Sequence, residues 1–207
     1  MKYTLLLNTL LACVLASCAT PPPQLPPNYV APIVGPLAKI QVRSNQLAGF
    51  GFFYSFDDQR NCKGNRLVTM TKTSQSQLKA STSLRADEPA SLWFSYAAPG
   101  NRSCNSVRTF KPASGKNYLV YVAATDVGCA LSIQDITDPA NPKFEPSFFA
   151  RTYVPTIVQA NAHCVATDVD AQIAKARKPN LSGLRMDDLK ALLPAAASGN
   201  GSETTTK

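Results

Sequence analysis

The chain has one histidine, His163, and it lies directly beside Cys164. A Ser-His-Asp or Cys-His mechanism needs a histidine that accepts a proton near neutral pH. Neighbouring side chains of an extended segment point to opposite faces, so His163 is badly placed to activate the Cys164 thiol. The sequence also lacks a G-x-S-x-G motif. We therefore expect no catalytic residues of these classes.

Two acidic pairs could serve other chemistry, namely glycosidic hydrolysis or metal binding. Asp57 and Asp58 are adjacent at a turn, where aspartate typically caps backbone groups. Asp168 and Asp170 begin like a calcium loop, but glycine is missing at its sixth position and glutamate at its twelfth. We expect no metal and no cofactor, and an envelope hydrolase ranks third among the functional hypotheses.

Length and composition indicate one folded domain with appendages. The chain has 207 residues, of which 44% are hydrophobic and 16% charged, and its formal net charge is +8. That apolar content can bury a core, which excludes wholesale disorder. The elements that position the candidate residues must therefore belong to a single core.

The first 18 residues contain a lysine, Lys2, then an apolar run from Leu5 to Leu15, and end in Leu-Ala-Ser-Cys at Cys18. The run is too short to cross a bilayer stably. This segment resembles a bacterial lipoprotein signal peptide with its lipobox. The resemblance implies removal of residues 1–17, acylation of Cys18 and, since no aspartate follows, the outer membrane. The alternative is an ordinary secretory signal peptide cut after a small residue such as Ala19.

Four cysteines remain once Cys13 leaves with the signal and Cys18 carries lipid. An even number in an exported chain indicates two disulfides, because the periplasm is oxidising. Three pairings are possible. Proximity in neighbouring hairpins favours Cys62 with Cys104 and Cys129 with Cys164.

Basic residues surround two of these cysteines. A Cys62–Cys104 bond would bring both groups to one end of the domain, where they could attract an anionic glycan, lipid phosphate or acidic protein face. We do not expect nucleic acid, which an exported lipid-anchored protein seldom meets. The possible anion-binding residues are Arg60, Lys63, Arg66, Arg102, Arg108 and Lys111.

The segments that flank the domain have their own compositions. Residues 18–36 are rich in proline and predict an extended tether with a reach of roughly 55 Å. Residues 165–194 predict short helices, the first capped by Thr167 and Asp170 and running to Arg177, the second from Arg185 to Leu193. Residues 195–207 predict a disordered tail.

Residues 37–164 alternate apolar and polar side chains in short runs separated by turn signals. Ala38, Ile40 and Val42, for example, alternate with polar residues, as a strand with one wet face requires. This pattern predicts a mainly β fold, a disulfide-stapled β-sandwich, although a small barrel is also compatible with it. Residues 78–84 fit either an edge strand or a loop. The expected strands are 38–42, 50–56, 67–71, 92–97, 107–110, 118–124, 130–133 and 148–154.

A Pro-Gly turn that leads into Tyr118 resembles the corner before a late strand in immunoglobulin-like and transthyretin-like sandwiches. There a tyrosine hydroxyl satisfies nearby backbone groups. The resemblance implies a structural role for Tyr118.

These features favour a non-enzymatic outer-membrane lipoprotein that faces the periplasm or the cell surface and has an envelope protein as partner. It would serve as an interaction or scaffolding module. The alternative is a domain that binds peptidoglycan or another anionic envelope polymer through the basic residues.

Overall fold

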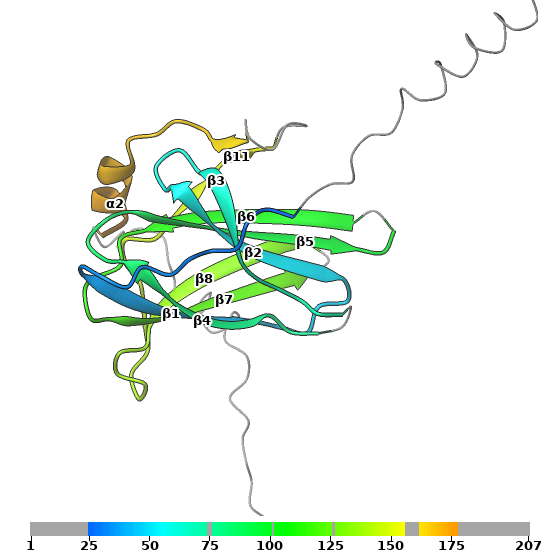
Figure 1. The fold of residues 1–207 in the computed structure, drawn as a ribbon, viewed down its shortest axis with the longest axis horizontal. Helices are drawn as coiled ribbons and strands as arrows, with labels where there is room; N and C mark the ends of the chain where they lie inside the picture. Colours follow the sequence, from blue (N-terminus) through cyan, green and yellow to red (C-terminus); the bar gives the residue numbers. More distant parts are fainter. Residues whose placement is uncertain (1–24, 74–75, 101, 126, 156–161, 178–207) are drawn as a thin grey trace, which may run out of the picture.

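The computed structural model describes residues 25–73, 76–100, 102–125, 127–155 and 162–177. Within them the chain forms two five-stranded sheets that pack face to face, a small two-stranded sheet and one helix (Figure 1). The expected disulfide-stapled β-sandwich is confirmed. The signal peptide, Cys18, the second helix and the tail lie outside the described residues.

The first sheet has the strand order β4-β1-β7-β8-β9. The interior strand β1 is antiparallel to β4 and parallel to β7, so that Lys39 lies opposite Ser83 on one side and Asn117 on the other. The strands are β1 (Leu37–Ser44), β4 (Lys79–Arg85), β7 (Asn117–Thr125), β8 (Gly128–Asp135) and β9 (Lys143–Phe144).

The second sheet has the strand order β10-β6-β5-β2-β3 and is antiparallel throughout. Its register places Ser55 opposite Leu92, and Leu92 opposite Arg108. The β2–β3 turn therefore lies at the Arg108 end of β6. The strands are β2 (Phe50–Asp58), β3 (Lys63–Met70), β5 (Ala90–Ala98), β6 (Arg102–Phe110) and β10 (Phe149–Arg151).

The core lies between the two sheets and is built from alternate positions of each strand. Ile40 and Val42 of β1 and Val120 of β7 are fully buried, as are Phe53 of β2 and Phe94 of β5. A strand sends successive side chains to opposite faces, so each sheet has one face on this core and one turned outward. This confirms the period-two prediction.

The two disulfides join Cys62 to Cys164 and Cys104 to Cys129, with Cα atoms 5.2 Å and 5.5 Å apart. The expected bonds were confirmed for these four cysteines, but the expected pairing was wrong. Cys62 lies in the β2–β3 turn and Cys104 near the far end of β6, so the length of the sheet separates them. Cys104–Cys129 instead links the two sheets.

The stretch of residues 78–84 is resolved as the edge strand β4. Its outward positions are polar, and its inward positions are Ala80, Thr82 and the buried Leu84. Because Ala80 and Thr82 are small or carry a hydroxyl, the apolar alternation is weak, and the sequence of residues 78–84 fits a loop as well as a strand.

The proline-rich segment is not wholly a free tether. The Tyr29 amide donates to the Leu67 carbonyl of β3 and the Leu67 amide to the Pro27 carbonyl, at 2.8 Å and 2.9 Å. The Tyr29 hydroxyl donates to the Ser83 carbonyl of β4 at 2.8 Å. Residues 27–29 thus join the edge strands of both sheets, which shortens the expected tether of residues 18–36.

The C-terminal part of the described chain packs beside the second sheet. β11 (Tyr153–Val154) pairs with β12 (His163–Cys164), and α2 (Val169–Arg177) follows. The helix cap was expected at Thr167, but the structure places it one residue later. The Asp168 carboxylate accepts the Ala171 amide at 3.0 Å, while the Gln172 amide donates to the Asp168 carbonyl.

The role expected for Tyr118 is confirmed. Its hydroxyl accepts a hydrogen bond from the Ala113 amide at 2.9 Å, and its ring packs edge-on against Phe110. Burial raises the pKa of Tyr118 to about 12, so the hydroxyl stays protonated at neutral pH.

Candidate functional site

The outer face of the first sheet carries four cations on two adjacent strands. The inward positions of β1 are Ala38, Ile40 and Val42, so its odd-numbered residues point outward. The same alternation applies to β4, whose inward Leu84 is buried. The outward cations, which we call the basic face, are Lys39 and Arg43 of β1 and Lys79 and Arg85 of β4.

The pairing of β1 with β4 sets the spacing of the basic face. Arg43 lies directly opposite Lys79, and Arg85 opposite Leu37 at the other end. Along β1, Lys39 and Arg43 are about 13 Å apart, because a strand rises about 3.3 Å per residue. The face is therefore an extended stripe.

No carboxylate lies within ion-pair distance of the basic face among the described residues. The strands β1, β4, β7 and β8 contain one acid, Asp135, and it pairs with Lys116 at 3.1 Å. Like charges directly opposite on neighbouring strands destabilise a sheet. The Arg43–Lys79 pair therefore destabilises the sheet, and an anion bound between the two side chains would relieve the repulsion.

Lysine on an edge strand also discourages pairing with other chains, which accounts for part of the charge on β4. It does not account for Lys39 and Arg43, because β1 is an interior strand with a partner on each side. Protection of an edge strand therefore leaves Lys39 and Arg43 unexplained.

Tyr29 links the basic face to the N-terminal segment. Burial raises the pKa of the Tyr29 hydroxyl, and the nearby Arg85 guanidinium partly offsets this rise. The hydroxyl hydrogen bond to Ser83 lies between Lys79 and Arg85 along β4. The proline-rich segment therefore reaches the edge of the basic face.

The basic residues singled out from the sequence do not form one cluster. Their convergence depended on a Cys62–Cys104 bond, which is absent. Arg60 pairs with Asp170 at 3.0 Å and Arg66 with Asp57 at 2.6 Å. Lys63 starts β3 at the Arg60 end, whereas Arg102 starts β6 at the opposite end of the sheet.

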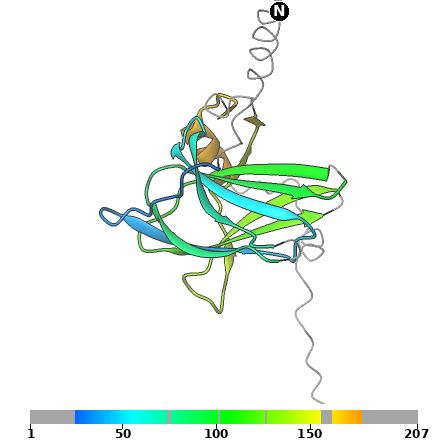
Figure 2. The ribbon, with the colours of Figure 1, turned by 45° about the vertical axis from the view of Figure 1, so that its right-hand side comes forward.

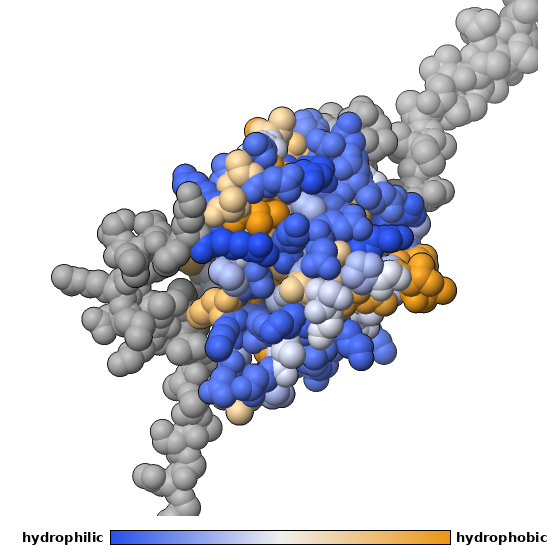
Figure 3. Space-filling model, turned by 90° about the vertical axis from the view of Figure 1, so that its left-hand side faces the viewer, coloured by the Kyte–Doolittle hydropathy of each residue, from blue (hydrophilic) through white to orange (hydrophobic). Residues whose placement is uncertain are grey.

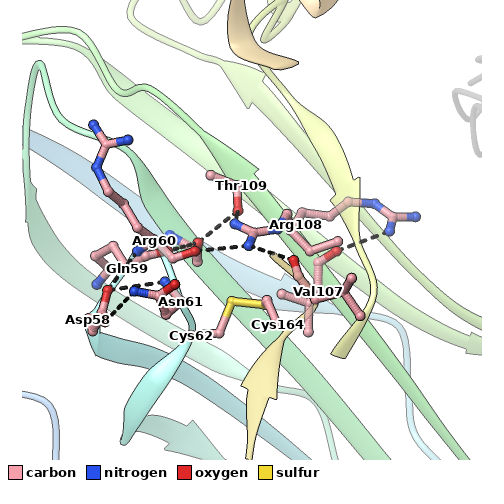
Figure 4. Close-up of a disulfide and its surroundings, with 12 residues drawn as sticks. Asp58, Gln59, Arg60, Asn61, Cys62, Val107, Arg108, Thr109 and Cys164 are labelled. Carbon is pink, nitrogen blue, oxygen red and sulfur yellow. Dashed lines mark hydrogen bonds between the residues drawn. A yellow bond between two sulfur atoms is a disulfide. The ribbon is translucent and has the colours of Figure 1, made fainter. Parts of the chain in front are cut away.

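The remaining two of these residues also diverge from Arg60. The Arg108 side chain points away from Arg60 (Figure 4) and lies over the Phe148 ring at 5.7 Å, and burial lowers its pKa. Lys111 follows β6, and its backbone amide donates to the Ser147 hydroxyl at 2.9 Å. The expected anion-binding patch is therefore replaced by the basic face.

The candidate acid and base residues are held in structural roles. Asp58 accepts the amides of Arg60 and Asn61, each at 3.1 Å (Figure 4). His163 lies on β12, where it pairs in register with Val154. Among the described residues, no group of three or more histidine, cysteine, aspartate or glutamate side chains is placed to hold a metal ion.

The outer face of the second sheet carries a cluster of aromatic side chains. Tyr54 and Trp93 stack at 4.5 Å between ring centroids, and Trp93 and Tyr153 lie 4.7 Å apart. Phe56 packs nearby, together with the buried Cys62–Cys164 bond. The rings pack against one another and against the buried Phe56, with Trp93 and Tyr153 partly buried, so this cluster is a second, smaller core beside β11 and β12.

Two shallow grooves lie at opposite ends of the sandwich. One, of about 440 Å³, is bordered by Tyr96, Arg102 and the turn that contains Val127. The other, of about 470 Å³, separates residues 29–34 from the sandwich near Leu84 and Pro89. The first groove is lined by no acid and no histidine. The second is bordered by Asp57 and Glu88, but Asp57 is held in an ion pair with Arg66.

No protein-family model matches this chain, and no curated protein is significantly similar to it in sequence. The described residues contain no helix that is both long and apolar enough to cross a membrane.

The sequence contained one signal for the basic face that the prediction did not use. Lys39 and Arg43 are among the polar residues that alternate with Ala38, Ile40 and Val42 on the wet side of the predicted strand. Lys79 lies within the stretch whose structure the pattern leaves open, and Arg85 directly follows it, so the pairing of two basic strands could not be anticipated. Only the β1–β4 register brings the four cations together.

Proposed function

We propose that this chain is a lipid-anchored, non-enzymatic interaction module of the bacterial outer membrane. The lipobox at Cys18 provides the anchor. The four other cysteines of the mature chain are all paired, which supports folding in an oxidising compartment outside the cytosol. The domain then faces the periplasm or the cell surface and assembles with other components of the envelope.

The ligand of this module is an anionic envelope polymer, such as peptidoglycan, bound along the basic face. The observation that carries this proposal is the row of four cations without a carboxylate partner. An extended polymer with carboxylates or phosphodiesters at intervals complements such a stripe. A protein partner with an acidic face is the second candidate, and the same cations favour it.

The test compares two variants of the detergent-solubilised, lipidated chain in cosedimentation with purified sacculi. The first changes Lys39, Arg43, Lys79 and Arg85 to Gln. The matched control changes four exposed cations elsewhere to Gln, so that both variants lose the same charge; these are Lys63, Lys72, Lys175 and Arg177.

Each exposed ion pair contributes about 0.2–1 kcal/mol, so removal of four should weaken binding by between about fourfold and several hundredfold. The control should bind nearly as tightly as the wild type, with a small loss of affinity because its net positive charge is lower. Binding by the wild type should weaken as salt is raised, because exposed charges are screened. Equal pelleting of the two variants would contradict polymer binding by the basic face. Crosslinking in intact cells would then identify the acidic protein partner.

Lipid anchoring is tested separately with Cys18→Ala. The wild type should incorporate labelled palmitate and fractionate with the outer membrane. The variant should do neither. An unprocessed wild-type chain that is soluble in the cytosol with free thiols would contradict the anchor and the compartment together.

A further inference from the structure

The loop between the proline-rich segment and β1 exposes a set of aliphatic side chains. Val30 is 85% exposed, Ile33 87% and Val34 67%. The loop projects at one end of the domain, as the deep blue segment at the left of Figures 1 and 2. A view onto this end shows hydrophobic atoms protruding at the right-hand margin among hydrophilic ones (Figure 3).

Both ends of this loop are fixed to the sandwich. At one end Tyr29 bonds to Leu67 and Ser83. At the other end the Ala86 amide donates to the Pro36 carbonyl at 2.9 Å. Pro32 and Pro36 further restrict the loop backbone. The aliphatic side chains are therefore held in place before they meet any partner, and a groove of about 470 Å³ separates their loop from the body of the domain.

The position of the lipidation site limits what the loop can meet. Pro27 lies nine positions after Cys18 and is the first of the described residues that is hydrogen-bonded to the sandwich. An extended chain spans at most about 3.3–3.6 Å per residue, so these two residues are at most about 32 Å apart. An acylated Cys18 lies at the lipid surface, and the loop begins only three residues after Pro27. The loop is thus within reach of that surface.

We propose that the side chains of Val30, Ile33 and Val34 insert into the lipid surface beside the acyl chains of Cys18. The inference rests on the proposed lipid anchor and adds a second contact, which fixes the orientation of the domain. Aliphatic side chains at an interface bury themselves about 5–10 Å deep, at the boundary of headgroups and acyl chains.

The attraction is apolar rather than electrostatic. Charged residues that border the groove are of both signs, with Arg85 against Asp57 and Glu88. Insertion of the loop should therefore be insensitive to salt, in contrast to polymer binding by the basic face.

The test uses the full lipidated chain in phosphatidylcholine vesicles whose acyl chains carry bromine. Ile33→Trp places a fluorescent probe in the loop. Val127→Trp is the matched control, because Val127 is 98% exposed in the β7–β8 turn at the opposite end of the first sheet. Trp93 remains in both variants, and the wild type supplies its contribution to the fluorescence.

We expect the Ile33→Trp probe to emit at shorter wavelength and to be quenched at least twofold more than the Val127→Trp probe, at low and at high salt. Equal quenching of the two probes would overturn the proposal. A shift in emission without quenching would place the loop against protein, such as a second copy, and would also overturn it. A chain that carries no lipid would instead refute the anchor, which palmitate labelling of the same sample reveals.

Discussion

Asp58 shows how one carboxylate shapes the turn that presents Cys62. It accepts the backbone amides of Arg60 and Asn61 and the side-chain amide of Asn61. Four residues after Asp58, Cys62 adopts a positive φ of 55°, a conformation that non-glycine residues rarely take. The hydrogen bonds of Asp58 thus hold the turn in the geometry that the Cys62–Cys164 bond uses.

The same hydrogen bonds make Asp58 a source of pH-dependent stability. The side-chain bond from Asn61, followed by the two backbone bonds, lowers the pKa of Asp58 below its usual 3.8. A lowered folded-state pKa gives stability that is present above the unfolded-state pKa and is lost as pH falls through the folded value. We predict that Asp58→Asn reduces the fall in unfolding free energy between about pH 5 and pH 3. Urea unfolding at both pH values measures it, and equal falls in variant and wild type would contradict it.

Arg151 is a buried cation of a different kind, only 7% exposed. Its guanidinium donates to the carbonyls of Arg60 and Val165 at 2.9 Å and 3.3 Å, and to the Thr109 hydroxyl at 3.5 Å, while its Nε has no partner. Burial lowers the pKa of this guanidinium. Arg151 thus joins three segments through neutral acceptors: the β2–β3 turn at Arg60, β6 at Thr109 and the residue after Cys164. These contacts hold together the segments around the Cys62–Cys164 bond.

At the scale of elements, residues 27–29 of the N-terminal segment cover the edge strands β3 and β4. Exposed strand edges are templates for unwanted pairing. Residues 27–29 occupy the β3 edge through Leu67 and reach the β4 edge through Ser83. Proline is tolerated in this position because an edge segment needs few backbone donors.

We predict that Tyr29→Phe loosens this cover without unfolding the sandwich. Loss of one partly buried hydrogen bond costs about 0.5–1.5 kcal/mol, or up to about tenfold in a local opening equilibrium. Hydrogen exchange of the Tyr29 and Leu67 amides should accelerate by that factor. The amide of Ile40, in the core of β1, serves as the control. Unchanged exchange at Leu67 would contradict a role for the Tyr29 hydroxyl.

On the scale of the whole molecule, the two disulfides act at different places. Cys104–Cys129 joins the two sheets, and Cys62–Cys164 ties the C-terminal hairpin to the outer face of the second sheet. The Cys104–Cys129 bond joins residues 25 positions apart in the sequence, and the Cys62–Cys164 bond joins residues 102 positions apart. Longer loops restrict the unfolded chain more.

We predict that the Cys62→Ala/Cys164→Ala variant loses about 1 kcal/mol more unfolding free energy than the Cys104→Ala/Cys129→Ala variant. Loop closure contributes about 4.7 kcal/mol for roughly 100 residues and about 3.5 kcal/mol for 25. Cys62 and Cys164 are also more deeply buried, so the cavity left behind acts in the same direction. Urea unfolding at neutral pH compares the two, and an equal or larger loss in the second variant would contradict the prediction.

The sequence by itself determined the features that depend on local patterns. Alternation along residues such as Ala38, Ile40 and Val42 predicted the strands and the sandwich, and the turn before Tyr118 predicted its hydroxyl contact. The number of cysteines predicted two bonds. The strands and the turn depend on side-chain alternation and turn chemistry, which neighbouring residues specify. The number of disulfides depends only on the even number of cysteines.

Only the tertiary structure decided which distant residues meet. The register of the second sheet separates Cys62 from Cys104, which changed the disulfide pairing and divided the expected basic patch. The β1–β4 pairing, with 35 or more residues between paired positions, assembled the basic face from Lys39, Arg43 and their neighbours. Strand order and register follow from core packing over the whole chain, so no local pattern contains them.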